Sequence, residues 1–94
     1  GRMERLDLGQ DFQIFPDFAV TPFAFREMLT SAKTLGKRLI TVFGHCGSHP
    51  DSVVRHELGK IAAEFSDIVL VTDDEPYFED PAQIRSQILA GIFS

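Results

Sequence analysis

Short apolar runs alternate along the chain with longer segments in which apolar residues recur every three or four positions. Three of the short runs predict strands, at 12–15, 39–43 and 68–72. The second and third are almost continuously apolar and rich in β-branched residues, a pattern typical of strands covered on both faces. Pro16 places the first run at an edge of the sheet or at a turn away from it.

Segments with helical spacing follow each of these runs. Thr21-Pro22 supplies a cap and a first-turn proline for a helix that ends at Gly36, and Asp80-Pro81 does the same for the last helix. The middle helix has an apolar face made by Val54, Leu58, Ile61, Ala62 and Phe65. The order βαβαβα, with connections long enough for crossovers, predicts a three-layer α/β fold with a mainly parallel sheet.

Three loops stand between a predicted strand and the helix that follows it, at 17–22, 44–47 and 73–76. In a parallel sheet, such loops collect at the carboxyl edge, where open α/β sheets bind their ligands. The sequence therefore predicts a ligand site along this edge.

The composition is that of an ordinary globular domain. Ninety-four residues, of which 44% are hydrophobic and 24% charged, fit a single domain over residues 1–94. The net charge of -5 and the lack of a basic block argue against a nucleic-acid partner. No run is long enough for membrane insertion and the first residues do not form a signal peptide, so we expect a cytoplasmic location. The start at Gly1 suggests a piece of a longer protein.

The sequence contains neither of the glycine-rich phosphate-binding patterns, G-x-x-x-x-G-K-[ST] or G-x-G-x-x-G. His45, Cys46, His49 and His56 do not follow the spacing of a paired-ligand metal site. Cys46 also lacks a base that a nearby carboxylate could orient. We therefore predict no metal site and no catalytic residue.

Acidic residues crowd the loop after the third predicted strand. Asp73 and Asp74 are nearest the strand end, where they could contact a cationic substrate or lie on a solvated surface. Glu79 and Asp80 also suit the positive end of the following helix. Asp17 could accept hydrogen bonds from a ribose or could form a local turn, and the sequence leaves both alternatives open.

Several of these segments resemble those of Mur ligases, in the same order along the chain. The resemblance is best to the MurE type, the UDP-N-acetylmuramoyl-tripeptide synthetases, and spans nearly the whole chain. The matching stretches are Gly1 to Arg5, Asp17 to Pro22, Phe43-Gly44, Gly59 to Ala62, Thr72 to Pro76 and Ile88 to Ile92.

The resemblance implies a Rossmann-like carboxyl-terminal domain, truncated before its last strand, that closes over a central ATPase domain in cis. Such ligases activate the carboxylate of a UDP-N-acetylmuramoyl-dipeptide as an acyl phosphate, which the amine of an incoming amino acid attacks. Arg2, Asp17 and Thr21 would contact ATP, while the absent central domain would hold most of the phosphate charge and the Mg²⁺. The fragment alone is expected to be inactive.

The chain departs from the family at the residues that would recognise the incoming amino acid. Asp74-Glu75-Pro76-Tyr77 stands where members that add diaminopimelate carry D-N-P-R. The family's other substrate-binding arginine, in the glycine-rich loop, has no match near His49. Arg55, in contrast, matches the arginine of the K-R-P stretch that follows. A tyrosine cannot copy the two-pronged contact of arginine with a carboxylate, so lysine is predicted over diaminopimelate. The predicted substrate-binding residues are His49, Arg55, Asp73, Asp74, Glu75 and Tyr77.

A further departure is Val20, which replaces the histidine of the usual D-Y-A-H-T-P. Besides a MurE-type ligase, two other interpretations stay open. One is another Mur-ligase-like protein, such as a lipid II amidating subunit or a folylpolyglutamate or cyanophycin synthetase. Another is a non-catalytic nucleotide-binding module.

Overall fold

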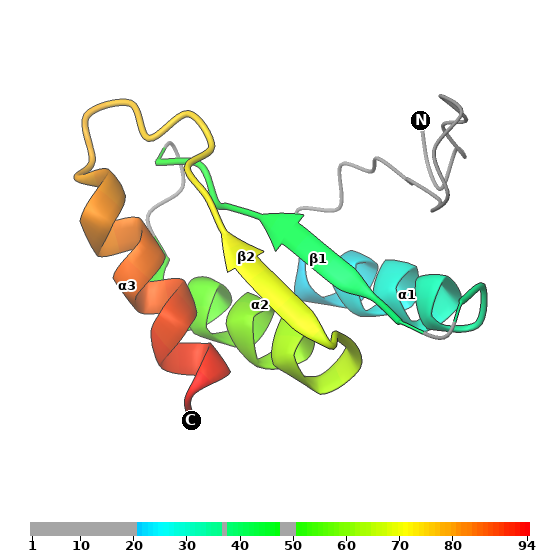
Figure 1. Ribbon diagram of the computed structural model, residues 1–94. Coiled ribbons are helices and arrows are strands. Elements are labelled where there is room, and N and C mark those ends of the chain that lie inside the picture. The colour runs from blue at the N-terminus through cyan, green and yellow to red at the C-terminus, as the bar shows by residue number, and fades with distance from the viewer. Residues whose placement is uncertain (1–20, 37, 48–50) are drawn as a thin grey trace.

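The computed structural model describes residues 21–36, 38–47 and 51–94. Within them the chain forms three helices and two strands (Figure 1). In chain order these are α1 (Pro22–Lys33), β1 (Ile40–Phe43), α2 (Ser52–Phe65), β2 (Ile68–Val71) and α3 (Pro81–Ile92). The predicted strand at 12–15 lies outside the described residues.

Side-chain caps fix the start of each helix. Thr21 Oγ1 accepts a hydrogen bond from Ala24 N at 3.1 Å, and Asp80 caps α3 through Ala82 N at 3.0 Å, as the sequence predicted. Asp51 caps α2 by accepting from the backbone N–H groups of the second and third helical residues. This third cap was not recognised in the sequence.

The two strands pair in parallel, which confirms the predicted direction. Ile40 lies opposite Ile68 and Phe43 lies opposite Val71, so the pair runs without an offset. The α/β character and the parallel pair are thus established for the described residues. The third layer and the full Rossmann-like order stay predictions.

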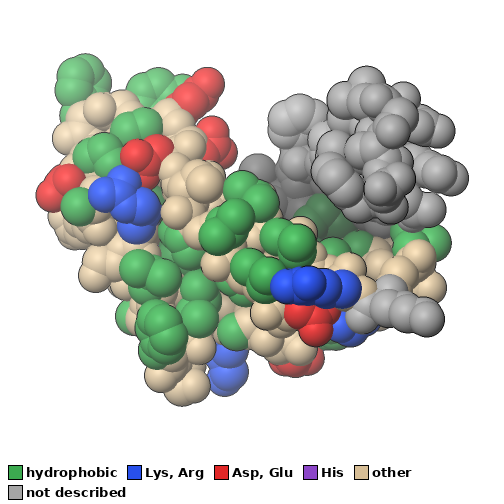
Figure 2. Space-filling model, in the orientation of Figure 1, with side chains coloured by type: hydrophobic (Ala, Val, Ile, Leu, Met, Phe, Trp, Pro, Cys, Tyr) green, Lys and Arg blue, Asp and Glu red, His purple; other side chains and the backbone are tan. Residues whose placement is uncertain are grey.

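All three helices lie on the same side of the strand pair (Figure 1). Thr41 faces them and is buried, whereas Ile40, Val42 and Leu70 on the other face are each more than half exposed. Figure 2 shows hydrophobic side chains along this open face. Coverage of both faces, expected from the sequence, is therefore not observed, because no described helix packs on the second face.

The buried core extends over all three helices, with Ile84 and Ile88 contributed by α3, and its main cluster lies between α1, α2 and β1. Phe25 and Leu29 of α1 pack with Leu58, Ile61 and Ala62 of α2. The rings of Phe25 and Phe43 meet at a centroid distance of 4.9 Å, which joins α1 to β1. Burial of these apolar side chains stabilises the packing of α1 and α2 on the strands.

Two glycines bring α2 and α3 into backbone contact. A Cβ at Gly59 would lie 2.0 Å from Ile88 O, and one at Gly91 would lie 1.9 Å from His56 O. Any side chain at either position would push the helices apart. This close contact fixes α3 beside the first turns of α2, where the candidate site begins.

None of the helices in the described segments combines the length and the apolar character that crossing a membrane requires.

Candidate functional site

Two of the three predicted loops lie against each other at the carboxyl edge of the strands. The loop 44–47 follows β1 and the loop 72–80 follows β2, and the N–H of Gly47 donates to Glu75 O at 3.1 Å. A Cβ at Gly47 would lie 1.9 Å from Pro76 O, so this contact requires glycine. The structure confirms the shared edge for these loops, whereas residues 17–20 of the third lie outside the described part of the chain.

Arg55 lies at the centre of this region, in the first turns of α2, and it is fully buried. Its Nε donates to His45 Nδ1 at 3.0 Å, and its Nη2 donates to Cys46 O at 3.1 Å. Both of those acceptors belong to the loop after β1.

The remaining donors of Arg55 reach the loop after β2 and helix α3. Nη1 and Nη2 grip the carboxylate of Glu79 in a two-pronged contact, with Nη2 to Oε1 at 2.9 Å. Nη1 also donates to Gln87 Oε1 at 2.8 Å. A guanidinium has five N–H donors, and Arg55 makes five hydrogen bonds within the described chain.

These contacts set the charge states at the centre of the site. The hydrogen bonds from Arg55 lower the pKa of Glu79 below its ordinary value, against a smaller opposing effect of desolvation. Glu79 is therefore a carboxylate that compensates the buried guanidinium. His45 accepts at Nδ1, so its ring proton belongs on Nε2.

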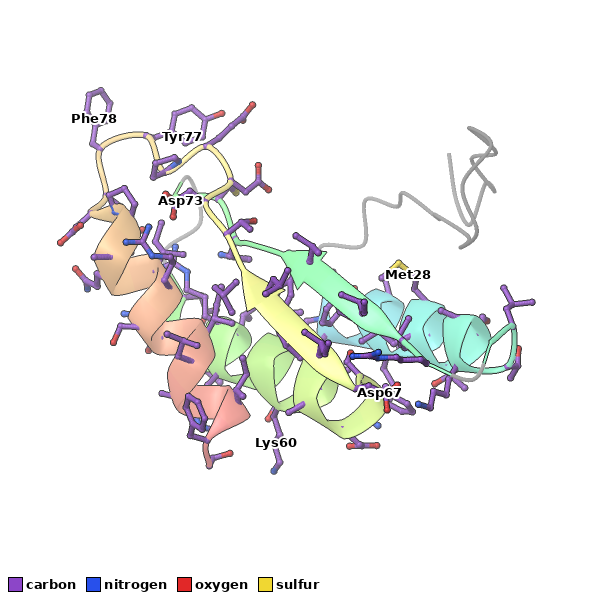
Figure 3. All side chains as sticks on the ribbon, in the orientation of Figure 1. Met28, Lys60, Asp67, Asp73, Tyr77 and Phe78 are labelled. Carbon is purple, nitrogen blue, oxygen red and sulfur yellow. The ribbon has the colours of Figure 1, made fainter. Side chains whose placement is uncertain are left out.

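The segment Asp73 to Phe78 forms the outer part of the site. Asp73 pairs with Arg85 of α3, and Tyr77 Oη donates to Glu75 Oε2 at 3.0 Å. This hydrogen bond is the main cause that raises the pKa of Tyr77 above its ordinary value. Tyr77 and Phe78 project outward from the tip of the loop (Figure 3).

Two residues of this segment have a backbone conformation that is unfavourable for any residue with a side chain. Glu75 has φ of 42° and Tyr77 has φ of 55°, both in the left-handed region. Each such residue costs about 1–2 kcal/mol, so the conformation persists only where contacts with its surroundings offset this cost. Here the enforcing contacts are the Gly47–Glu75 hydrogen bond and the anchor at Glu79.

Asp74 differs from its neighbours because none of the described side chains engages its carboxylate. It is exposed, and no described side chain forms a hydrogen bond or ion pair with it. Of the acidic residues predicted to contact substrate, Asp74 is the one whose charge is most available to a ligand.

The other predicted site residues are placed as follows. Arg2, Asp17 and His49 lie outside the described residues. Thr21 is exposed at the start of α1, where its hydroxyl oxygen caps the helix and its hydroxyl hydrogen can still donate. The described residues contain no group of three or more metal-ligating side chains.

Three residues of the Arg55 cluster were missed from the sequence: His45, Glu79 and Gln87. A signal for them existed, because Arg55 shares the apolar face of its helix with Leu58 and Ala62. An arginine on such a face requires a carboxylate and further acceptors inside the fold. Their identity depends on which loops the fold brings there, which the local pattern does not reveal.

Comparison with known proteins identifies the family to which the chain belongs. The family model "Mur ligase, glutamate ligase domain" matches residues 1–93. The chain belongs to the Mur ligase family. This confirms the resemblance at the level of the carboxyl-terminal domain.

Several known proteins are similar in sequence over almost the whole chain. One from Syntrophomonas wolfei is 45% identical over 93 residues, which is 98% of this chain and 19% of the relative. One from Rickettsia typhi is 44% identical over 95 residues, covering 98% and 18%, and one from Fusobacterium nucleatum is 40% identical over 93 residues, covering 97% and 19%. Each is named UDP-N-acetylmuramoyl-L-alanyl-D-glutamate–2,6-diaminopimelate ligase. The chain thus spans less than a fifth of the length of these relatives.

Proposed function

We propose that this chain is the carboxyl-terminal domain of an ATP-dependent ligase that joins an amino acid to UDP-N-acetylmuramoyl-dipeptide for peptidoglycan precursor synthesis. The observation that carries the proposal is the family match over residues 1–93. The two described loops that meet at the carboxyl edge support it, because the loop after β2 carries Asp73, Asp74, Glu75 and Tyr77, which are predicted to contact substrate. The cytoplasmic location stays a prediction.

In this proposal the residues divide into two groups. Arg2, Asp17 and Thr21 contact ATP, whose Mg²⁺ and phosphates belong mainly to a central domain in cis. ATP activates the dipeptide carboxylate as an acyl phosphate in such ligases, and this domain presents the amino acid that attacks it.

The second group contacts the amino acid: His49, Asp73, Asp74, Glu75 and Tyr77. Arg55 is grouped with them by resemblance, and it contacts both loops of the carboxyl edge. An exposed, negatively charged loop favours a substrate that carries a side-chain ammonium. Asp74 is the best placed partner, because its carboxylate is not engaged by a described side chain. Both lysine and diaminopimelate carry such an ammonium.

The two amino acids differ in the distal carboxylate of diaminopimelate. The names of the relatives support diaminopimelate and give no support to a preference for lysine. The observation that favours lysine is Tyr77, which stands at the position of the carboxylate-reading arginine and donates to Glu75. Tyr77 offers a distal carboxylate no cationic partner, so lysine is our candidate for this chain and diaminopimelate is the alternative.

The test is an assay of the complete protein that contains this chain. It is given ATP, Mg²⁺ and UDP-N-acetylmuramoyl-L-alanyl-D-glutamate with lysine or meso-diaminopimelate, and product and ADP are both measured. We expect ADP release to depend on the amino acid, with lysine giving the higher kcat/KM. A higher kcat/KM for diaminopimelate would overturn the lysine assignment, and no product with any amino acid would overturn the ligase assignment.

A further inference from the structure

Arg55 joins four separate segments of the chain through one side chain. It belongs to α2, and its partners are His45 and Cys46 after β1, Glu79 after β2 and Gln87 in α3. No other described side chain connects both loops of the carboxyl edge to both of these helices. It is also completely buried, so the connection is shielded from solvent.

All of its donors are occupied, so Arg55 would have to break a bond within the fold before it could bind a substrate carboxylate. Breaking the buried contact with Glu79 would leave a charge uncompensated inside the protein, which is costly. We infer that Arg55 is a positioning residue, which sets the shape of the amino-acid-binding loop Asp74 to Tyr77 without touching the amino acid. This inference rests on the proposed function and adds to it how the loop is held.

The attachment points of the loop explain how this works. On one side, Thr72 N donates to Phe43 O at 2.8 Å, which fixes the loop to the end of β1. On the other side, Glu79 is held by the fork of Arg55. Between them, the Gly47 N–H reaches Glu75 O, and the same stretch of the 44–47 loop gives the Cys46 carbonyl to Arg55.

The backbone conformation makes this support necessary. Glu75 and Tyr77 both lie in the left-handed region, which they would leave if the loop were free. Loss of the anchor at Glu79 should therefore let the loop relax and move Asp74 and Tyr77 away from their present positions. The packing of α1 against α2 is made by other, apolar side chains, Phe25 and Leu29 of α1 with Leu58, Ile61 and Ala62 of α2.

The test compares Glu79→Gln with Glu64→Gln in the complete protein that contains this chain. Glu64 also receives a two-pronged contact from an arginine, Arg26, but this pair joins α1 to α2 and is about half exposed. The two variants make the same chemical change in a buried anchor and in an exposed pair. Arg55→Lys is a third variant, which keeps the charge and loses the fork.

Two readouts separate positioning from general destabilisation. Hydrogen exchange of the segment 44–47 reports on the Gly47 amide that bridges the loops, and it can be measured whether or not the protein is a ligase. Steady-state kinetics report the KM values for the amino acid and for ATP. We expect Glu79→Gln to speed exchange at 44–47 and to raise the amino-acid KM about ten- to a hundredfold, by analogy with the loss of groups that support direct metal ligands. The ATP KM should change little.

Glu64→Gln should leave both readouts unchanged, and Arg55→Lys should behave like Glu79→Gln. Faster exchange without a change in amino-acid KM would overturn the positioning role, as would an equal rise in both KM values. An unchanged exchange rate in Glu79→Gln would show that the Arg55–Glu79 contact does not hold the loop in place. If the unaltered protein joins no amino acid, the proposed function fails, while the exchange result still decides whether Arg55 holds the loop.

Discussion

At the scale of single residues, Arg55 and Glu79 form a pair that the local sequence pattern does not reveal. In the sequence, Glu79 reads as a helix-end carboxylate and Arg55 as a substrate contact by resemblance. In the structure, the two form a two-pronged pair inside the carboxyl edge. A pairing between residues 24 positions apart follows from the crossover of the chain, and no feature of either segment alone reveals it.

The pair predicts a pH dependence of stability. The pKa of Glu79 is lowered from its ordinary value of 4.5 in the folded protein, so the unfolded state binds a proton first as the pH falls. The stabilisation from Glu79 is therefore fully present above about pH 4.5 and is lost as the pH falls through its folded pKa.

Chemical denaturation between pH 7 and pH 3 measures this effect. Glu79→Gln should lose less of its remaining stability over this range than the unaltered protein, because it lacks this titrating group. Glu64→Gln, the matched control, should retain the contribution of Glu79. An acid dependence of Glu79→Gln as steep as that of the unaltered protein would contradict the role of the pair.

At the scale of elements, helix starts were predictable where a capping residue precedes a proline. Thr21-Pro22 and Asp80-Pro81 begin α1 and α3 as expected, whereas Asp51 was missed because no proline follows it. The contact between α2 and α3 was not predicted either. Gly59 and Gly91 are 32 positions apart, and only the assembled fold shows that each glycine faces the backbone of the other helix.

The α2–α3 contact predicts a large effect for Gly91→Ala. The added Cβ would meet His56 O at 1.9 Å, so the helices must separate, at a cost of about 1–3 kcal/mol or more. Thermal or urea unfolding should show this loss of stability. Gly36→Ala is the matched control, because its Cβ would find no atom nearer than 3.9 Å and the change should be neutral or slightly stabilising. Equal stabilities of the two variants would show that α2 and α3 are not in backbone contact.

At the scale of the whole molecule, the alternation of strand and helix predicted the parallel pair, and with it the meeting of two loops at one edge. This succeeded because the position of a loop at a parallel sheet edge follows from strand direction alone. Coverage of the sheet could not be predicted in the same way. The pattern of β1 is that of a strand buried on both faces, yet Val42 is 58% exposed, because all described helices pack on the opposite side.

The central claim also concerns the whole molecule: we propose that the loop after β2 binds the incoming amino acid of a ligase. Kinetics of Asp74→Ala in the complete protein test it most directly, with Glu27→Ala, an exposed carboxylate on α1, as the control. Loss of a charged hydrogen-bonding partner is worth about 1.5–3 kcal/mol, so the amino-acid KM should rise about tenfold or more while the ATP KM stays nearly constant. An amino-acid KM that is the same in Asp74→Ala and in the unaltered protein would contradict the account.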